Sequence, residues 1–158
     1  MTFLGIDPGT RRIGYGIVRI QGDAVNKPEF GAAGILKIKS VDDANALVET
    51  KREVDALIKK YKPDAVAVEK LYFATNQKTA IAVAQARGVI LLAACALGIP
   101  IREYTPNEVK LGVTGYGFAD KKAVLKMVRL ILGKNDLRVI DDASDALALA
   151  IMASNDRR

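Results

Sequence analysis

Short apolar runs alternate with segments of helical periodicity along this chain. Runs bounded by glycine, proline or charged residues predict five strands, over residues 2–7, 12–20, 29–39, 65–69 and 99–103. Apolar residues recurring every three or four positions predict helices over 42–61, 78–97, 120–132 and 142–155. A short helix should begin at Pro106, with Thr105 as N-cap and Glu108 completing a capping box, and the glycine-rich stretch 112–117 should be a loop.

The order of these elements predicts an α/β fold. Three successive strands favour an antiparallel meander, and the later alternation of helix and strand favours parallel strands joined by helical crossovers. We expect a mixed five-stranded sheet with helices on both faces, in which the first and fourth strands are neighbours if the meander is extended next to its first strand. With 158 residues and no internal repeat or linker, residues 1–158 should form one domain.

The composition limits the chemistry. A formal net charge of +6 and a pI near 9.5 favour polyanionic partners such as nucleic acid. The chain has no histidine and one cysteine, which excludes thiolate and imidazole zinc sites, histidine-based triads and an intramolecular disulfide. Any bound metal must therefore have oxygen ligands, which indicates Mg²⁺ or Mn²⁺. Cys95 lies among aliphatic residues and is expected to be a small core residue.

The most apolar stretch predicts a buried helix. It runs from Ala80 to Ile99 and is interrupted by Gln85 and Arg87, so a helix packed in the protein explains it better than a membrane span. The N-terminal residues lack the basic segment and apolar run of a signal peptide. A cytoplasmic protein without a membrane partner is therefore expected.

Acidic residues stand where three predicted elements begin or end. Asp141, Asp142 and Asp145 open the last helix, where Asp141 fits an N-cap and an acidic first turn complements the helix dipole. Asp145 falls after that turn, on the same helical face as Asp142. Asp7 and Glu69 end the first and fourth strands, and taken singly they fit a turn and a solvated strand end.

These separate positions come together if the first and fourth strands are neighbours. The two strand ends would then face the acidic helix start and form a cluster of carboxylates. Such a cluster is unfavourable alone, because like charges raise one another's pKa, and divalent cations offset the repulsion. Two bound metal ions can activate a water and stabilise both oxygens in phosphodiester hydrolysis. A basic surface around an acidic, metal-binding centre indicates a nuclease.

Three motifs resemble those of the RuvC Holliday junction resolvases, in the ribonuclease-H-like superfamily. "GIDPGTRRIGYGIV" is similar to the family's first motif, "AVEKLYFATNQKTAIAVAQARGVI" to its second, and "DDASDALALAIMA" to its last. The similarity runs in order over nearly the whole chain. It implies a ribonuclease-H-like fold.

The resemblance also implies an active site. Its metal-binding and catalytic carboxylates would be Asp7, Glu69, Asp142 and Asp145, which leaves Asp141 as a helix cap. The implied cofactor is Mg²⁺, two ions per active site, with Mn²⁺ as a substitute. Lys110 and Lys121 match basic residues implicated in catalysis, and Lys122 remains an alternative to Lys121.

Further residues match positions that contact DNA. Tyr72 falls where the family has an aromatic side chain that stacks against a base near the crossover. Asn76, Gln77 and Lys78 would contact the DNA backbone. Arg12, beside the first strand, could bind phosphate or lie in a solvated turn, as could Arg11.

The function implied is a homodimeric, Mg²⁺-dependent endodeoxyribonuclease. It would resolve four-way DNA junctions in recombination and repair, by paired symmetric nicks made with metal-activated water. A RuvA–RuvB branch-migration complex is a possible partner. The residues also leave open a ribosomal RNA nuclease of the YqgF type, a non-catalytic junction-binding module, and a phosphotransferase of the actin or sugar-kinase type, although that class needs two such domains.

Overall fold

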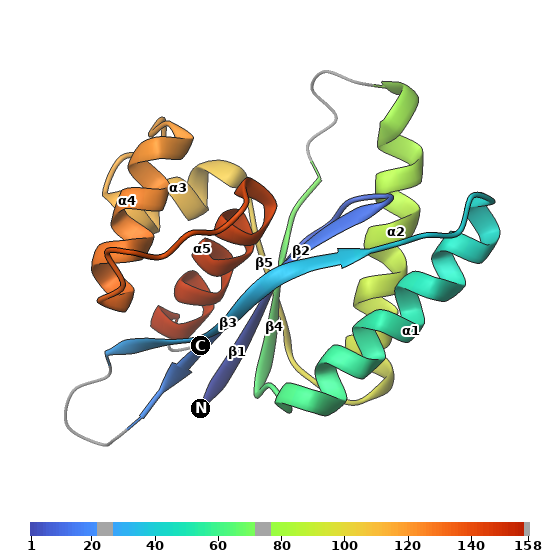
Figure 1. Ribbon diagram of the computed structural model, residues 1–158, viewed down its shortest axis with the longest axis horizontal. Helices are drawn as coiled ribbons and strands as arrows, with labels where there is room; N and C mark the ends of the chain where they lie inside the picture. The colour runs from blue at the N-terminus through green and yellow to red at the C-terminus, as the bar shows by residue number, and fades with distance from the viewer. Residues whose placement is uncertain (22–26, 72–76, 157–158) are drawn as a thin grey trace.

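The computed structural model describes residues 1–21, 27–71 and 77–156, without the side chains of Gln77 and Lys78. Its described strands form one mixed sheet (Figure 1), made of β1 (Thr2–Asp7), β2 (Arg12–Ile20), β3 (Pro28–Lys37), β4 (Ala65–Glu69) and β5 (Ile101–Tyr104). The strand order is β3-β2-β1-β4-β5. β1, β2 and β3 pair antiparallel, whereas β4 is parallel to β1 and β5 is parallel to β4. The predicted mixed sheet, with the first and fourth strands adjacent, is confirmed.

Helices cover both faces of this sheet (Figure 1). One face carries α1 (Asp43–Tyr61) and α2 (Gln77–Ala96), and the other carries α3 (Pro106–Thr114), α4 (Lys121–Leu132) and α5 (Asp141–Asn155). The capping box of α3 forms as predicted. The Glu108 amide donates to Thr105 Oγ1 at 3.2 Å, and the Thr105 amide donates to Glu108 Oε2 at 2.7 Å. These contacts satisfy two amides that the first turn of a helix leaves unpaired.

Two local predictions were wrong. α3 continues to Thr114 and ends at Gly115, whose φ of 78° suits glycine, so only the second half of the 112–117 stretch is a loop. The N-cap of α5 is Ile140, with no side-chain cap, rather than Asp141. Ile140 already has the extended backbone of a cap, so the helix begins one residue earlier than expected and Asp141 is an exposed residue of its first turn.

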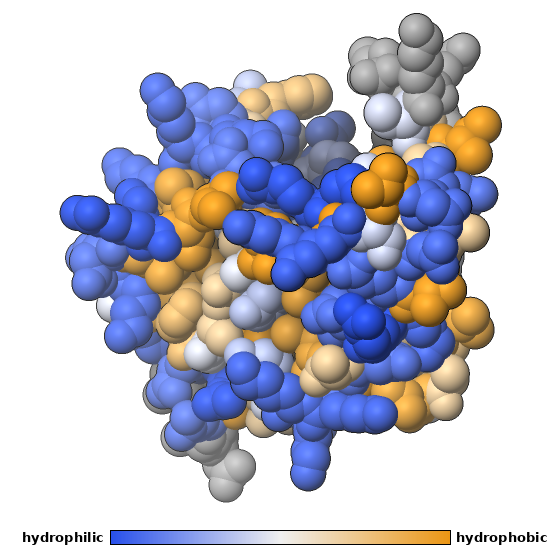
Figure 2. Space-filling model, turned by 45° about the vertical axis from the view of Figure 1, so that its right-hand side comes forward, coloured by the Kyte–Doolittle hydropathy of each residue, from blue (hydrophilic) through white to orange (hydrophobic). Residues whose placement is uncertain are grey.

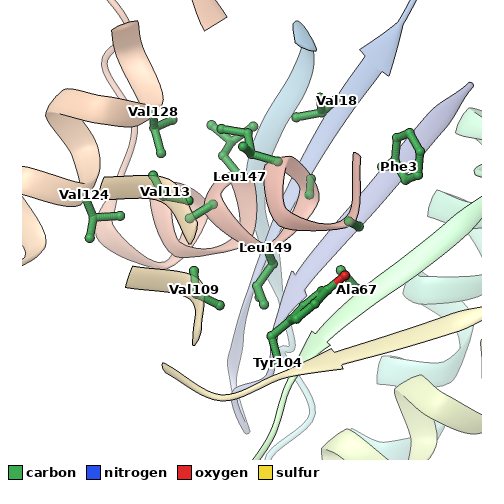
Figure 3. Packing of buried hydrophobic residues seen from close by; sticks show 14 of the residues in the cluster. Phe3, Val18, Ala67, Tyr104, Val109, Val113, Val124, Val128, Leu147 and Leu149 are labelled. Atoms are coloured by element: carbon green, nitrogen blue, oxygen red, sulfur yellow. The ribbon is translucent and has the colours of Figure 1, made fainter. Parts of the chain in front are cut away.

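The alternation of strand side chains divides the core into two layers. In β4, Val66 and Val68 join the cluster packed against α1 and α2, while Ala65 and Ala67 join the cluster on the α5 side. Figure 3 shows Leu147 and Leu149 of α5 among the surrounding side chains of that second cluster. Burial on both faces explains why the two central parallel strands, β1 and β4, are almost wholly apolar.

Glycines let the backbone of α5 lie directly on β1 and β2. A Cβ added at Gly5 would overlap the backbone of Ala146, and one at Gly16 would come within 2.6 Å of the Leu147 amide nitrogen. Gly14 lies in the same way under the backbone of Asp142. This close packing fixes the acidic start of α5 against the sheet.

The predicted buried helix, α2, is buried on one side only. Its residues Ala86, Ile90, Ala93 and Ala94 pack in the core. The opposite side carries an exposed row that we call the α2 stripe: Ile81, Gln85, Gly88, Leu92 and Cys95. Because Cys95 is exposed, its prediction as a core residue was wrong. In Figure 2, which turns the right-hand side of Figure 1 forward, hydrophobic residues in orange interrupt the hydrophilic surface.

The same helix is the one described segment that could span a membrane by length and composition. The apolar window is Thr79–Ala96, and 22% of it is buried. Since the core helix of a folded domain passes the same test, this property alone does not distinguish a membrane from a protein partner on the exposed side.

Candidate active site

Carboxylates from three elements meet at one end of the sheet. Asp7 and Glu69 are the last residues of β1 and β4, whose parallel pairing places their carboxyl ends side by side. Asp142 and Asp145 lie at the start of α5, whose backbone packs on β1 and β2. A cavity of about 370 Å³ is lined by Asp7, Glu69, Asp145, Lys110 and Lys121 together with Pro106, Val109, Val124 and Leu149. The topology thus brings together residues that are far apart in the sequence.

The carboxylates interact electrostatically. Burial, followed by the charges of Glu69, Asp145 and Asp142, raises the pKa of Asp7 from 3.8 to about 7. Burial first, and then the Asp145 charge, raises the pKa of Glu69, while Lys121 and Lys110 oppose that rise. These carboxyl groups therefore lie close enough together for each to disfavour the ionised form of its neighbour.

Two cationic side chains contact the acidic residues of α5. Lys121 Nζ lies 3.3 Å from Asp145 Oδ2, and that charge is the main cause of a raised Lys121 pKa. The Arg12 guanidinium lies 3.2 Å from Asp142 Oδ2. Lys122 is exposed and does not line the cavity, so the geometry favours Lys121 over its neighbour as the active-site lysine.

The site suits a hard divalent cation by its chemistry. No group of three or more acidic, histidine or cysteine side chains within the described part of the chain is already gathered closely enough to hold a metal ion. The acidic residues that line the cavity nevertheless offer carboxylate oxygens, and the Lys121 charge only partly opposes the rise in the pKa of Asp7.

Of the predicted DNA-binding side chains, the structure describes only those of Arg11 and Arg12. Tyr72 and Asn76 lie outside the described residues. Lys78 belongs to the first turn of α2 by its backbone, but its side chain lies outside the described part, as does that of Gln77. Arg12 is half exposed beside Asp142 and remains available to a ligand at the edge of the site.

Sequence comparison assigns the family. The model of the family described as Crossover junction endodeoxyribonuclease RuvC matches residues 3–153. The chain belongs to the RuvC family. A protein of that name from Syntrophomonas wolfei is 50% identical over 151 residues, covering 96% of this chain and 87% of the relative. The one from Fusobacterium nucleatum is 43% identical over 155 residues, covering 98% and 80%.

Solved structures agree with this assignment. Thermus thermophilus RuvC superposes on this RuvC-family chain with a TM-score of 0.86 and 32% identity, covering 96% of this chain and 92% of that one. The same protein in complex with a Holliday junction substrate matches with a TM-score of 0.86 and 33% identity. The yeast mitochondrial resolvase Ydc2, at 11% identity and a TM-score of 0.69, shares the fold. The predicted family and fold class are confirmed.

Sequence reasoning missed one residue that supports the site of this RuvC-family chain. Arg87 of α2 donates from Nε to the backbone oxygen of Glu69 at 2.9 Å and forms an ion pair with Glu103 of β5. Only 16% of its side chain is exposed. A charged residue inside an otherwise apolar helix was the available signal, because a buried charge is stable only when it is paired and hydrogen-bonded.

We expect Arg87→Met to slow junction cleavage about 10- to 100-fold without changing junction binding in EDTA. The substitution removes the donor that holds the Glu69 backbone, and a small displacement of an active-site group has effects of that size. The cleavage rate should fall, and so should the affinity for Mn²⁺, which is measured by calorimetry. Arg52→Met on α1, which removes only surface ion pairs, is the matched control. Unchanged cleavage and Mn²⁺ binding would show that Arg87 has no positioning role.

Proposed function

We propose that this chain is a structure-selective endodeoxyribonuclease that resolves four-way DNA junctions by paired symmetric nicks, in recombination and DNA repair. Membership of the RuvC family supports it, as does the likeness to Thermus thermophilus RuvC, solved with a Holliday junction substrate. The observation that carries it is the cavity in which the strand-end acids Asp7 and Glu69 share a wall with Asp145 and two lysines. This arrangement offers ligands for metal ions and positive charge for a phosphate.

The cofactor we propose is Mg²⁺, two ions per active site, with Mn²⁺ able to substitute. Asp7, Glu69, Asp142 and Asp145 would hold it. When bound, it supplies an activated water and neutralises charge on the attacked phosphate, leaving 5′-phosphate and 3′-hydroxyl ends. Asp7 would give up its proton if such a cation were bound, because a nearby positive charge lowers a carboxyl pKa.

The two lysines of the cavity would act on the phosphate. Lys110 and Lys121 line the cavity, and both lower the pKa of Glu69, so their charges reach the carboxylates directly. In the complex they would stabilise the negative charge that develops on the scissile phosphate. The apolar wall formed by Val109, Val124 and Leu149 limits water around these charges and thereby strengthens their effect.

DNA contacts outside the cavity are proposed for four residues. Tyr72 would stack on a base near the crossover, and Asn76 and Lys78 would contact the backbone of the DNA. Arg12 would exchange Asp142 for a phosphate oxygen when a metal ion engages that carboxylate.

A homodimer is proposed through the α2 stripe. Its residues recur at alternating intervals of four and three, which is the spacing of a seam between two packed helices. Gly88 lies at the centre of the stripe, and a Cβ added there meets no atom within 4 Å. A second copy of the helix could therefore approach closely. Two-fold symmetry would present two active sites to two equivalent strands.

A cytoplasmic location is proposed, in keeping with the expectation from the sequence and with the family, whereas docking on a RuvA–RuvB branch-migration complex is proposed from the family resemblance alone. Co-sedimentation of the purified chain with RuvA–RuvB bound to a junction is the direct test of docking.

The experiment that tests the function is strand cleavage of a labelled synthetic four-way DNA junction. We expect paired nicks on opposing strands with Mg²⁺, no nicks in EDTA, and no nicks in linear duplex of the same sequence. Mn²⁺ should restore activity after EDTA treatment and dialysis. Junction binding without nicks, across several junction sequences and both metals, would support a non-catalytic binding module instead.

A further inference from the structure

Two aromatic rings project from the connection between α3 and α4. Tyr116 is 62% exposed and Phe118 is 77% exposed. The rings contact each other edge to face, with centroids 5.9 Å apart and an interplanar angle of 60°. We call them the 116/118 pair. Large exposed rings of this kind are enriched where a protein binds a partner.

The connection that carries the pair is held by backbone hydrogen bonds. The Tyr116 amide donates to the Thr114 side-chain oxygen Oγ1 at 3.1 Å, and the Ala119 amide donates to the Tyr116 backbone oxygen at 3.1 Å. Ala119 is buried, and Asp120 caps α4 by accepting from the Ala123 amide at 2.7 Å. The rings are therefore presented by an ordered turn, so binding a ligand would cost little ordering of the backbone.

The pair lies between the two lysines of the active site in the sequence. Phe118 is three residues before Lys121, so their Cα atoms are at most about 11 Å apart. Lys121 in turn contacts Asp145 of the site. Exposed Lys122 adds a further positive charge next to the turn. Rings interleaved with cations match a strand of nucleic acid, which offers flat base faces and negative phosphates.

A second copy of the chain does not explain the pair. The α3–α4 connection lies on the sheet face opposite α2 (Figure 1), so a dimer formed through the α2 stripe leaves these rings uncovered. The start of α5, with its acidic residues, is on the same side of the sheet as the pair. The position thus favours the substrate of the neighbouring cavity as the ligand.

We propose that Tyr116 and Phe118 form a stacking site for an accessible nucleobase of the junction strand being cut. Because the Cα atoms of Phe118 and Lys121 are at most about 11 Å apart, the base it would take is one near the scissile phosphate, and the three nucleotides on either side are the positions to test. This inference rests on the proposed function. It deepens that function, because a base can offer a face only where stacking is interrupted, as at the crossover.

The test is a double-mutant cycle on junction binding in EDTA, where no cleavage occurs. Tyr116→Ala with Phe118→Ala should weaken junction binding about tenfold or more, as expected for loss of base stacking. An abasic site placed in turn at each of the three positions on either side of the scissile phosphate should, at one position, weaken wild-type binding similarly. Combining that site with the double variant should add almost nothing.

Controls separate stacking from charge and from folding. The variant with Tyr116→Phe and Phe118→Tyr keeps both rings and should bind as wild type. Leu130→Ala on α4 removes an apolar side chain that is as exposed as Tyr116, and it should also bind as wild type. The double alanine variant should keep the salt dependence of binding, whereas Lys122→Ala should lower its slope by about 0.7 to 0.9 if that lysine contacts a phosphate. Phe118→Ser alone serves if the double variant fails to fold.

Wild-type binding by the alanine variants, or additive losses with every abasic site, would overturn the stacking site and indicate a protein partner for these rings. The proposed function is judged separately. A wild-type protein that binds but never nicks the junction would refute resolution while leaving the stacking test valid.

Discussion

Asp7→Asn is expected to abolish junction cleavage, by about 10³-fold or more, while junction binding in EDTA stays unchanged. Burial, followed by the charges of Glu69, Asp145 and Asp142, raises the pKa of Asp7 to about 7, and a carboxyl shifted in this way marks a candidate functional site. Asparagine preserves its shape but removes the negative charge that a divalent cation requires. Losses of this size follow removal of charge stabilisation in the transition state.

The same substitution should stabilise the protein when no divalent cation is present. The pKa of Asp7 rises from 3.8 to about 7 on folding, so between those pH values the folded state binds a proton that the unfolded state has released. Stability therefore falls as the pH rises through this interval, by about 4 kcal/mol at most. Asparagine removes that cost, so the variant should have the higher Tm at pH 8 in EDTA and a similar Tm at pH 4.

The two readouts together identify the role of Asp7. Asp136→Asn, at an exposed position away from the cavity, is the matched control and should change neither cleavage nor Tm. Loss of cleavage with a higher Tm at pH 8 cannot result from unfolding. Retained cleavage, or a lower Tm at pH 8 in EDTA, would contradict the assignment of Asp7 to the metal site.

Gly88→Arg is expected to convert the proposed dimer to a monomer and to abolish paired nicking. A Cβ added at this position meets no described atom within 4 Å, and a long charged side chain there would enter a partner helix packed on the α2 stripe. Replacing a mid-helix glycine should also stabilise α2 by about 1 kcal/mol. Sedimentation equilibrium should therefore report a folded monomer, and labelled junctions should lose simultaneous cuts in opposing strands.

Val48→Arg on α1 is the matched control. It places the same charge on another exposed apolar position, and it should leave the oligomeric state unchanged. A Gly88→Arg protein that remains dimeric would place the interface elsewhere. A wild-type protein that is monomeric at micromolar concentration on and off the junction would remove the dimer from the proposal.

The sequence predicted the elements better than the contacts between them. β1 and β4 were recognisable because both faces of each strand are apolar, and their adjacency was enough to bring Asp7 and Glu69 together. The helix start at Ile140 was not predictable from side-chain preferences, since a backbone conformation without a side-chain cap defines it. The local pattern was misleading there because acidic residues suit both the cap and the first turn.

Contacts made across the fold were the least visible. Arg87 supports a backbone oxygen 18 residues away, and backbone acceptors leave no trace in composition or spacing. Cys95 was assigned to the core because its sequence neighbours are aliphatic, yet the apolar character of α2 covers two faces. The sequence of such a helix shows that two of its faces are apolar. It does not show which face packs in the core of its own chain.

The glycine contacts under α5 affect how this protein can change in evolution. Because Gly5 and Gly16 put helix backbone against strand backbone, the distance from Asp145 to Asp7 does not depend on the size of any intervening side chain. Substitutions in either core can then alter stability while the active-site geometry persists. A single added methyl group at either glycine, in contrast, would move the helix as a unit. The core positions that tolerate substitution are thus distinct from the glycines of β1 and β2 that do not.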